Sequence, residues 1–203
     1  MKWQNVPALT FAILVLFMYL FTLSNLLLFY YSAVFFGLSS IPLTYFFYRR
    51  EIAEDMKYAM VQVALLFIAF FSIFSFFLVV DRNWAINLPV LFFVPVLVEE
   101  FNFRYVLQRI LLRSINRYGA LLIQAVLYVL YYSRYVVADN GAGYPFPYNL
   151  LMLFSVTGMA LIYGLLAAKT KNFIASTTLH LVIWGLFPLL AAYPALASVL
   201  VQT

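Results

Sequence analysis

The feature that most constrains this chain is a series of apolar runs, each about as long as a helix that crosses a lipid bilayer. The clearest run is YAMVQVALLFIAFFSIFSFFLVV at residues 58–80, which contains no charged side chain. A membrane helix needs about 20 predominantly apolar residues. Of the 203 residues, 67% are hydrophobic and only 9% are charged, which is more apolar surface than a water-soluble domain can cover. The sequence therefore predicts an integral membrane protein that forms one domain over residues 1–203.

The apolar runs divide into about seven predicted membrane helices, so the expected fold class is an all-α, polytopic transmembrane helix bundle. The predicted spans are 7–24, 27–48, 58–80, 86–109, 118–138, 148–168 and 172–191. The division between the first two rests on a short turn at Leu23–Asn25, and one long span over the first 48 residues stays open as an alternative. The short apolar segment after Pro194 is left unassigned.

The lysines and arginines indicate how the bundle is oriented. With the N-terminus in the cytoplasm, the outer side keeps only Arg82 and, near the outer end of the fifth span, Arg134. The cytoplasmic side then holds Lys2, Arg49, Arg50, Lys57, Arg109, Arg113, Arg117, Lys169 and Lys171. This is the positive-inside pattern of multi-pass membrane proteins. No dense run of cations is present, so the expected surroundings are a lipid bilayer and not nucleic acid.

The scarcity of cysteine and histidine limits the chemistry that the chain can perform. There is no cysteine and only one histidine, His180, which excludes disulfides, thiolate chemistry and sites with two histidines. Zinc sites usually draw on several histidine or cysteine ligands. The one set that could hold a metal is His180 with Glu99 and Glu100, and we expect neither a metal nor another cofactor.

Two adjacent acids, Glu99 and Glu100, lie within the fourth predicted span. A charged side chain at mid-bilayer costs about 2.5–3.5 kcal/mol on insertion scales, so a neighbouring pair indicates a function or a structural role. Arg104 follows Glu100 by four residues, which places the two on one helical face, where they can pair. Glu99 points about 100° away and has no partner on its own helix.

The predicted topology brings the lone histidine to the depth of these acids. Glu99 lies ten residues before Arg109, and His180 lies nine residues after Lys171, both counted from the same side of the membrane. At 1.5 Å per residue, each lies roughly 13–15 Å from that side. Pro95, one turn before Glu99, predicts a kink in the span.

The segment EEFNFR at residues 99–104 resembles the Glu-Glu-x-x-x-Arg signature of the CAAX protease and bacteriocin-processing family, also called the Abi family. It is followed by YVLQRIL and, at the distance that the family shows, by IASTTLHLVIWGLF. The resemblance covers roughly residues 90–190. Family members are membrane-embedded endopeptidases related to the type II CAAX prenyl endopeptidases. The resemblance implies that Glu99 and Glu100 are catalytic, with Arg104 as a structural or tuning cation.

Two further family motifs are only partly present. The Phe-x-x-x-His motif matches best at YVLYY, Tyr128 to Tyr132, so that Tyr132 stands where the family has a histidine. The His-x-x-x-Asn motif matches at HLVIW, where His180 is kept and Trp184 stands at the asparagine position. The resemblance therefore implies a catalytic His180 in a divergent member, with Tyr132 and Trp184 as weaker candidates. This span is rich in tyrosine, and Tyr128, Tyr131, Tyr132 and Tyr135 are mainly expected to pack or to form an interfacial belt.

The resemblance implies a hydrolase of the bacterial cytoplasmic membrane that acts on membrane-embedded peptides or lipoproteins. Glutamate-dependent chemistry would cleave a peptide bond or carry out an acyl-transfer modification of lipoproteins, with Glu99 as base and His180 as oxyanion donor. The alternative is a non-catalytic member that scaffolds a cell-envelope enzyme. In that case Glu100 and Arg104 form a structural pair and Glu99 bonds to His180. A transporter or channel is less favoured because no inverted repeat is visible in the sequence.

Overall fold

The protein is helical throughout the part that the structure describes. The computed structural model describes residues 42, 45, 46, 49, 50, 52–57, 59–137, 148–186 and 189. The α-helices are α3 (Met60–Val80), α4 (Arg82–Leu91), α5 (Gln108–Ser114), α6 (Arg117–Val137), α7 (Tyr148–Thr170) and α8 (Ile174–Gly185), and the π-helical segments are η2 (Phe92–Leu97) and η3 (Glu100–Leu107). These elements confirm the predicted all-α class. The first two predicted spans and the segment after Pro194 lie almost wholly outside the described residues.

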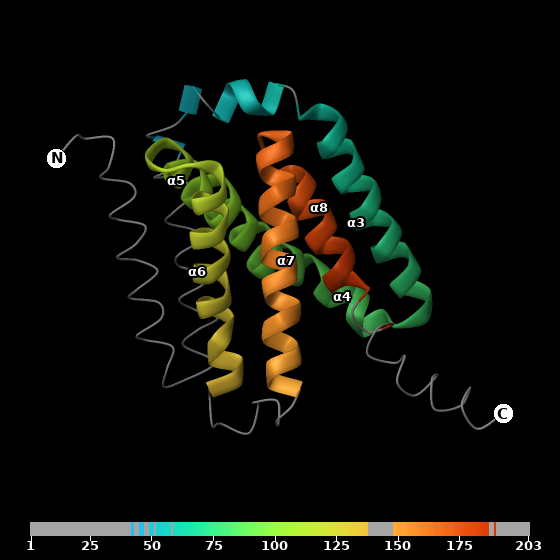
Figure 1. Cartoon of the computed structure of the whole chain (residues 1–203). Coiled ribbons are helices and arrows are strands. Elements are labelled where there is room, and N and C mark those ends of the chain that lie inside the picture. Colours follow the sequence, from blue (N-terminus) through green and yellow to red (C-terminus); the bar gives the residue numbers. More distant parts are fainter. Residues whose placement is uncertain are drawn as a thin grey trace.

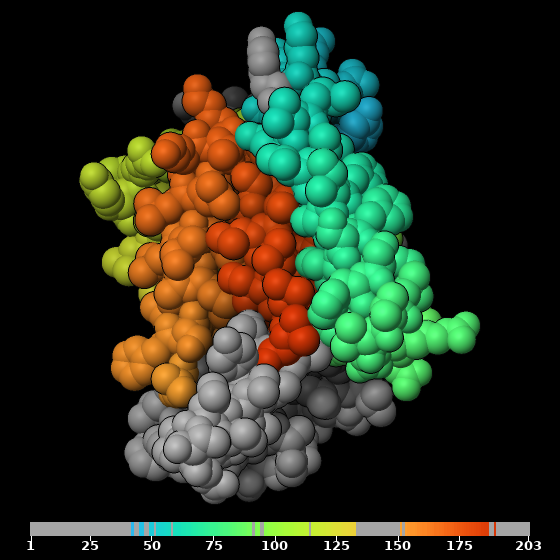
Figure 2. Space-filling model, turned by 90° about the vertical axis from the view of Figure 1, so that its right-hand side faces the viewer, coloured from blue at the N-terminus to red at the C-terminus, as the bar shows by residue number. Residues whose placement is uncertain are grey.

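The helices surround the segment that carries the two adjacent glutamates. The chain crosses the molecule obliquely from α4 through η2 and η3 to α5, behind the upright pair α6 and α7 (Figure 1). Figure 2 shows α8 packed between α3 and α7. The segment η3 contacts α6, α7 and α8, so three other helices supply side chains around it.

The outer surface of α3 is apolar and exposed. Phe67, Ile68 and Phe71 expose more than half of their surface, and Val79 exposes 88%. A helix as apolar as α3 would be mostly buried in a soluble protein, whereas lipid covers such a surface in a membrane. Of the described helices, α3 and the Leu153–Thr170 part of α7 are long and apolar enough to cross a membrane, and α8 is a shorter apolar helix. The count of seven spans and the N-terminal orientation stay predictions.

The fourth predicted span differs from the uninterrupted α-helix expected over 86–109. It begins at Arg82 and continues to Ser114, and its middle is π-helical in η2 and η3. Pro89 lies inside α4 and Pro95 inside η2. Proline has no N–H group to donate, so the regular α-helical hydrogen bonding is interrupted at both positions. π-Helical turns are rare and are frequently found at functional sites.

Helix α8 is held at both of its ends, which fixes the position of the histidine that it carries. At its start, the Asn172 side chain accepts a hydrogen bond from the backbone N–H of Ile174 at 3.0 Å and donates to Gln62 of α3 at 2.6 Å. At its end, the Trp84 indole N–H of α4 donates to the carbonyl oxygen of Gly185 at 3.0 Å. Because both anchors are hydrogen bonds to other helices, α8 cannot slide without breaking one of them.

Candidate functional site

Every side chain of η3 is buried, including its charged and polar ones. Polar groups are costly to remove from water unless they find partners. The buried polar residues of η3 and its surroundings are Glu99, Glu100, Asn102, Arg104, Gln108, Gln124, Ser176, Thr177 and His180. They lie between two apolar clusters, one formed mainly by η3, α6 and α7 and the other by α3, α4 and α8. The bundle therefore encloses a polar centre.

Glu100 lies between a histidine and an arginine. Its Oε1 atom is 2.9 Å from Nδ1 of His180, and its Oε2 atom is 3.6 Å from Nε of Arg104. The relative exposures of these three residues are 0%, 1% and 3%, so water does not screen their charges. The four-residue spacing in the sequence predicts the Glu100–Arg104 pair, and the structure contains it. The depth argument likewise agrees with the Glu100–His180 contact.

Glu99 is bound by two tyrosines of α6. The hydroxyl groups of Tyr128 and Tyr132 both donate to its Oε2 atom, at 2.9 Å and 2.7 Å. Tyr128 is 1% exposed and Tyr132 5%, and both pack in the apolar cluster around η3, as expected, so neither belongs to an interfacial belt, and in addition both act as hydrogen-bond donors. The physical reason is that a buried carboxylate needs donors, and α6 presents these two hydroxyl groups one helical turn apart.

The observed partners of the two glutamates differ from those expected under the scaffolding alternative, which paired Glu99 with His180. The structure pairs His180 with Glu100 instead. Adjacent residues on a helix point in different directions, so Glu100 faces α8 while Glu99 faces α6. The two carboxylates therefore have separate environments.

Arg104 is enclosed by aromatic rings and a glutamine. Its guanidinium carbon lies 4.3 Å from the ring centroid of Tyr128 and 5.7 Å from that of Tyr163, distances at which a cation is attracted by an aromatic face. With the Gln124 amide oriented so that its oxygen faces Arg104, that oxygen accepts a hydrogen bond from Nη1. Within the part of the chain that the structure describes, Nε and Nη2 of Arg104 have no hydrogen-bond partner.

Tyr163 of α7 is a site residue that the sequence did not indicate. Its ring stacks on the His180 imidazole with centroids 4.9 Å apart and planes 25° apart, and it is fully buried. The stacking restricts the rotation of the imidazole about the Nδ1 contact with Glu100. No sequence signal marks Tyr163, because the chain contains 16 tyrosines and only the fold brings this one to His180.

Trp184 does not replace the asparagine that the family motif has at its position. Trp184 is partly buried and packs against the apolar cluster that includes Leu88 and Leu181. It lies one turn beyond His180 on α8. The structure therefore brings together Glu99, Glu100, Arg104, His180 and Tyr132 and leaves Trp184 outside this group.

The geometry around the glutamates also bears on metal binding. Among the described residues, no group of three histidine, cysteine or acidic side chains is arranged to hold a metal ion.

Gly164 permits the close approach of α7 to this polar centre. A Cβ atom at this position would lie 2.5 Å from the end of the Gln124 amide and 2.5 Å from Cδ1 of Leu121. We expect Gly164→Ala to push Gln124 away from Arg104 and to lower the free energy of unfolding by about 1–3 kcal/mol. Thermal unfolding in detergent measures this loss. The matched control is Gly158→Ala on the same helix, where a Cβ would meet nothing within 4 Å. Equal melting temperatures for both variants would contradict this account.

The site combines two carboxylates with different accessibility. Glu99 keeps 5% of its surface exposed, whereas Glu100 keeps none. Within the described residues, the hydrogen bonds of Glu99 use only Oε2, which leaves Oε1 for another group. A carboxylate oxygen of this kind can accept a proton from a bound molecule, and a fixed histidine near it can stabilise developing negative charge. The arrangement therefore suits general acid–base chemistry.

Comparison with known proteins agrees with this geometry. A family model described as "Type II CAAX prenyl endopeptidase Rce1-like" matches residues 81–186. The match covers more than half of the 203-residue chain and runs from the start of α4 to the end of α8, so it contains both glutamates and His180. No curated protein and no protein of known structure matches the chain. The resemblance seen in the sequence is thereby confirmed, and the chain belongs to the Rce1-like family of type II CAAX prenyl endopeptidases.

Proposed function

We propose that this protein is a membrane-embedded endopeptidase in which Glu99 is the general base. The family is one of membrane proteases, which supports the reaction class. The observation that carries the assignment to Glu99 is the difference between the carboxylates. Glu100 is engaged by the His180 ring through Oε1 and by the Arg104 ion pair through Oε2, whereas among the residues that the structure describes Glu99 is engaged through Oε2. The substrates are peptides or lipoproteins whose cleavage site lies within the bilayer.

In the proposed reaction, Glu99 takes a proton from water while the water oxygen attacks the carbonyl carbon of the scissile bond. The carbonyl oxygen becomes negatively charged in the tetrahedral intermediate, and His180, which Glu100 holds at Nδ1, donates a hydrogen bond to it from Nε2. Glu99 then gives its proton to the leaving nitrogen as the carbon–nitrogen bond breaks. One water is consumed, a carboxyl and an amino terminus form, and Glu99 returns to its starting state.

Tyr132 is proposed as a positioning residue that replaces the motif histidine by holding Glu99. A hydrogen bond to a charged group contributes about 1.5–3 kcal/mol, so Tyr132→Phe is expected to lower kcat about 10-fold to 100-fold with little change in KM. Tyr132→His should restore much of the rate, because its ring can again donate to Glu99. Tyr118→Phe is the control, since Tyr118 lies on the same helix and is 82% exposed. Steady-state cleavage rates in proteoliposomes distinguish these outcomes, and a Tyr132→Phe rate equal to that of Tyr118→Phe would contradict the positioning role.

The second candidate function is a non-catalytic scaffold for a cell-envelope enzyme. The identity of Trp184 favours it, because an indole that packs against apolar residues stands at the position of the motif asparagine. Under this reading the polar centre only stabilises the bundle. Acyl transfer to a lipoprotein is a variant of the first proposal, in which an amine takes the place of water.

The experiment that tests the proposal compares membranes of a deletion strain carrying the wild-type gene, Glu99→Gln or no gene. Mass spectrometry of membrane proteins, lipoproteins and released peptides then identifies new termini. We expect termini that occur with the wild type and are missing with Glu99→Gln at equal protein level. If the Glu99→Gln strain produces every terminus that the wild type produces, and the variant protein still co-purifies with an envelope enzyme, the function is that of a scaffold and not of an endopeptidase.

A further inference from the structure

The imidazole of His180 is held by a hydrogen bond at one of its two nitrogens. The contact joins Nδ1 to Oε1 of Glu100 at 2.9 Å, and among the residues that the structure describes no other hydrogen bond fixes this ring. A ring that is bonded at one nitrogen can still turn about that bond. Such a turn moves Nε2, the atom that the proposed reaction directs to the scissile carbonyl group. The role of His180 therefore requires a second group that fixes the plane of the ring.

Tyr163 of α7 lies against the face of this imidazole. The two ring centroids are 4.9 Å apart and the planes differ by 25°, which is a stacked arrangement. Both side chains are fully buried. Protein interiors are close-packed, so an imidazole enclosed in this way cannot turn unless the tyrosine ring moves with it. The ring of Tyr163 is thus placed to fix the plane of His180.

The same tyrosine ring also lies near the second partner of Glu100. The guanidinium carbon of Arg104 is 5.7 Å from the Tyr163 ring centroid, a distance at which an aromatic ring still attracts a cation. Tyr163 therefore interacts with both groups that engage the Glu100 carboxylate, with His180 by stacking and with Arg104 as a cation.

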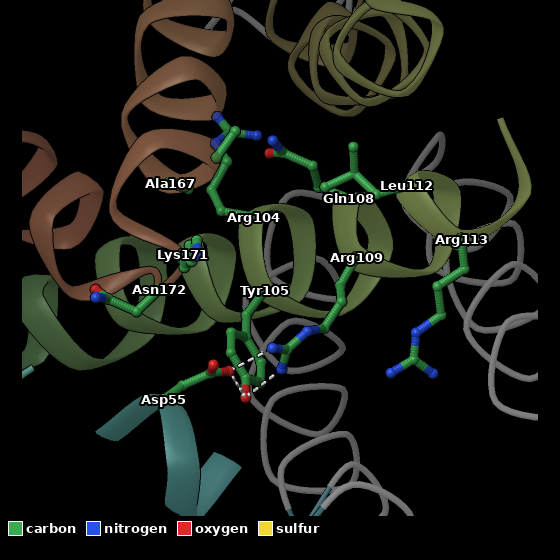
Figure 3. Close-up of a pocket in the computed structure, with 11 residues that line it drawn as sticks. Asp55, Arg104, Tyr105, Gln108, Arg109, Leu112, Arg113, Ala167, Lys171 and Asn172 are labelled. Carbon is green, nitrogen blue, oxygen red and sulfur yellow. Dashed lines mark hydrogen bonds and ion pairs between the residues drawn. The ribbon is translucent and has the colours of Figure 1, made fainter. Parts of the chain in front are cut away.

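The position of Tyr163 is fixed through its neighbour Gly164. Nε2 of Gln108 donates to the carbonyl oxygen of Gly164 at 2.8 Å, which ties α5 to α7 at this turn. Figure 3 shows Arg104 and Gln108 pointing to the same side, toward α7, whereas Tyr105 and Arg109 point toward Asp55. The segments η3 and α5 therefore hold α7 at the turn that carries Tyr163.

The ring of Tyr163, and not its hydroxyl group, has the contact with His180. Within the described part of the chain, the hydroxyl oxygen is buried and has no hydrogen-bond partner. A buried hydroxyl group without a partner destabilises a protein, so its removal should not lower stability. Phenylalanine is therefore expected to replace Tyr163, whereas an aliphatic side chain is not.

We propose that Tyr163 is a positioning residue for the reaction. Its aromatic ring holds the imidazole of His180 in the plane in which Nδ1 stays on Glu100 and Nε2 stays directed to the scissile carbonyl group. Tyr163 acts through His180 and does not itself contact the substrate. The effect on the reaction rate rests on the proposed function, whereas the holding of the imidazole is measurable independently of it.

His180 is the one histidine of the chain, which makes the holding of its ring directly measurable by NMR. Protein labelled with ¹³C and ¹⁵N in histidine, and purified without a histidine tag, gives the imidazole signals of His180 alone. The ring current of a stacked aromatic ring shifts protons above its face upfield. We expect Tyr163→Phe to keep this shift and Tyr163→Leu to lose it. Imidazole signals that are the same in Tyr163→Leu and the wild type would overturn the proposal.

The same variants are then compared for peptide cleavage in proteoliposomes. The kcat of Tyr163→Leu should fall about 10-fold to 100-fold with KM nearly unchanged, because a misplaced catalytic group loses much of its contribution. Tyr163→Phe should cleave at the wild-type rate. The matched control is Phe77→Leu, which removes a buried ring packed against Trp84 in the cluster formed by α3, α4 and α8. It should lower the melting temperature while leaving kcat and the His180 signals unchanged.

A Tyr163→Phe protein as slow as Tyr163→Leu would overturn the role of the ring, and so would equal losses of kcat in Tyr163→Leu and Phe77→Leu. If Tyr163→Leu loses the upfield shift but cleaves at the wild-type rate while Glu99→Gln is inactive, the positioning role fails and the endopeptidase remains. If Glu99→Gln is fully active, the proposed function fails, and the NMR comparison still decides whether Tyr163 holds His180. Should Tyr163→Leu not fold, Tyr163→Met removes the ring and fills its space with a longer, adaptable side chain.

Discussion

Replacing Glu99 with glutamine should lower kcat for peptide cleavage about 10²–10⁴-fold, the usual contribution of a general acid–base group. Glutamine has nearly the same shape, and its amide oxygen can still accept the hydrogen bonds that Tyr128 and Tyr132 donate to Glu99. The fold and the two tyrosine contacts are therefore kept, while the ability to take a proton from water is lost. KM should change little, because the lost interaction belongs to the transition state.

The measurement is the cleavage rate of a peptide identified from the membranes, with purified protein in proteoliposomes. Glu54→Gln is the matched control, because Glu54 is an exposed glutamate in the segment 52–57 and the same chemical change there touches no buried group. It should cleave at the wild-type rate. A Glu99→Gln protein that is folded and fully active would show that Glu99 is not the base, and an equal loss in both variants would indicate a general effect of charge.

Arg104→Met is expected to destabilise the protein strongly, by about 3–5 kcal/mol, the usual cost of removing one partner from a buried ion pair. Glu100 would remain fully buried without the arginine that compensates its charge, and Tyr128 would lose the cation over its ring. Methionine fills a similar apolar volume, so the loss reports the charge rather than a cavity. Thermal or denaturant unfolding in detergent measures it.

The double variant Glu100→Gln with Arg104→Met separates charge from packing. It should be more stable than Arg104→Met alone, because no uncompensated carboxylate remains in the bundle. The control Arg117→Met removes an exposed arginine at the start of α6 and should change stability by less than about 0.5 kcal/mol. Two results would show that the Glu100–Arg104 ion pair does not stabilise the protein as expected. One is an Arg104→Met protein that melts like Arg117→Met, and the other is a double variant that is the least stable of the three.

The sequence alone predicted the helical class and the location of the polar centre. Glu99 and Glu100 are conspicuous because a charge inside an apolar run is costly, so the amino-acid pattern itself marks them. The spacing of Arg104 predicts its pairing with Glu100, since side chains four residues apart share one face. The sequence also predicted that His180 lies at the same depth in the bundle as the two glutamates. That estimate requires only the direction of each span and the rise per residue.

Other parts of the site depend on contacts between helices and could not be read from the pattern. Tyr128 and Tyr132 belong to a helix rich in tyrosine, and only the position of α6 against η3 selects these two as donors to Glu99. Tyr163 became visible in the same way, through the packing of α7 against α8. The π-helical turns were missed because proline predicts a disturbance of the helix but not the form that it takes.

Trp184 illustrates the limit of reading roles from motif positions. The resemblance marked this position as one where the family has an asparagine, but the tryptophan packs in the apolar cluster beside α3 and α4. An indole is large and mostly apolar, so burying it among leucine and phenylalanine side chains is more favourable than turning it to the polar centre. Trp184 therefore occupies the motif position of the asparagine, but its side chain packs among apolar residues.

Cleavage in water labelled with ¹⁸O tests most directly the claim that Glu99 activates water to hydrolyse a peptide bond. Proteoliposomes containing the wild-type protein should produce peptides whose new carboxyl terminus carries one ¹⁸O atom, and Glu99→Gln should produce almost none. Products that contain no label, or that carry a new acyl group on an amine, would contradict hydrolysis. Labelled products at the wild-type rate from Glu99→Gln would contradict the role of Glu99.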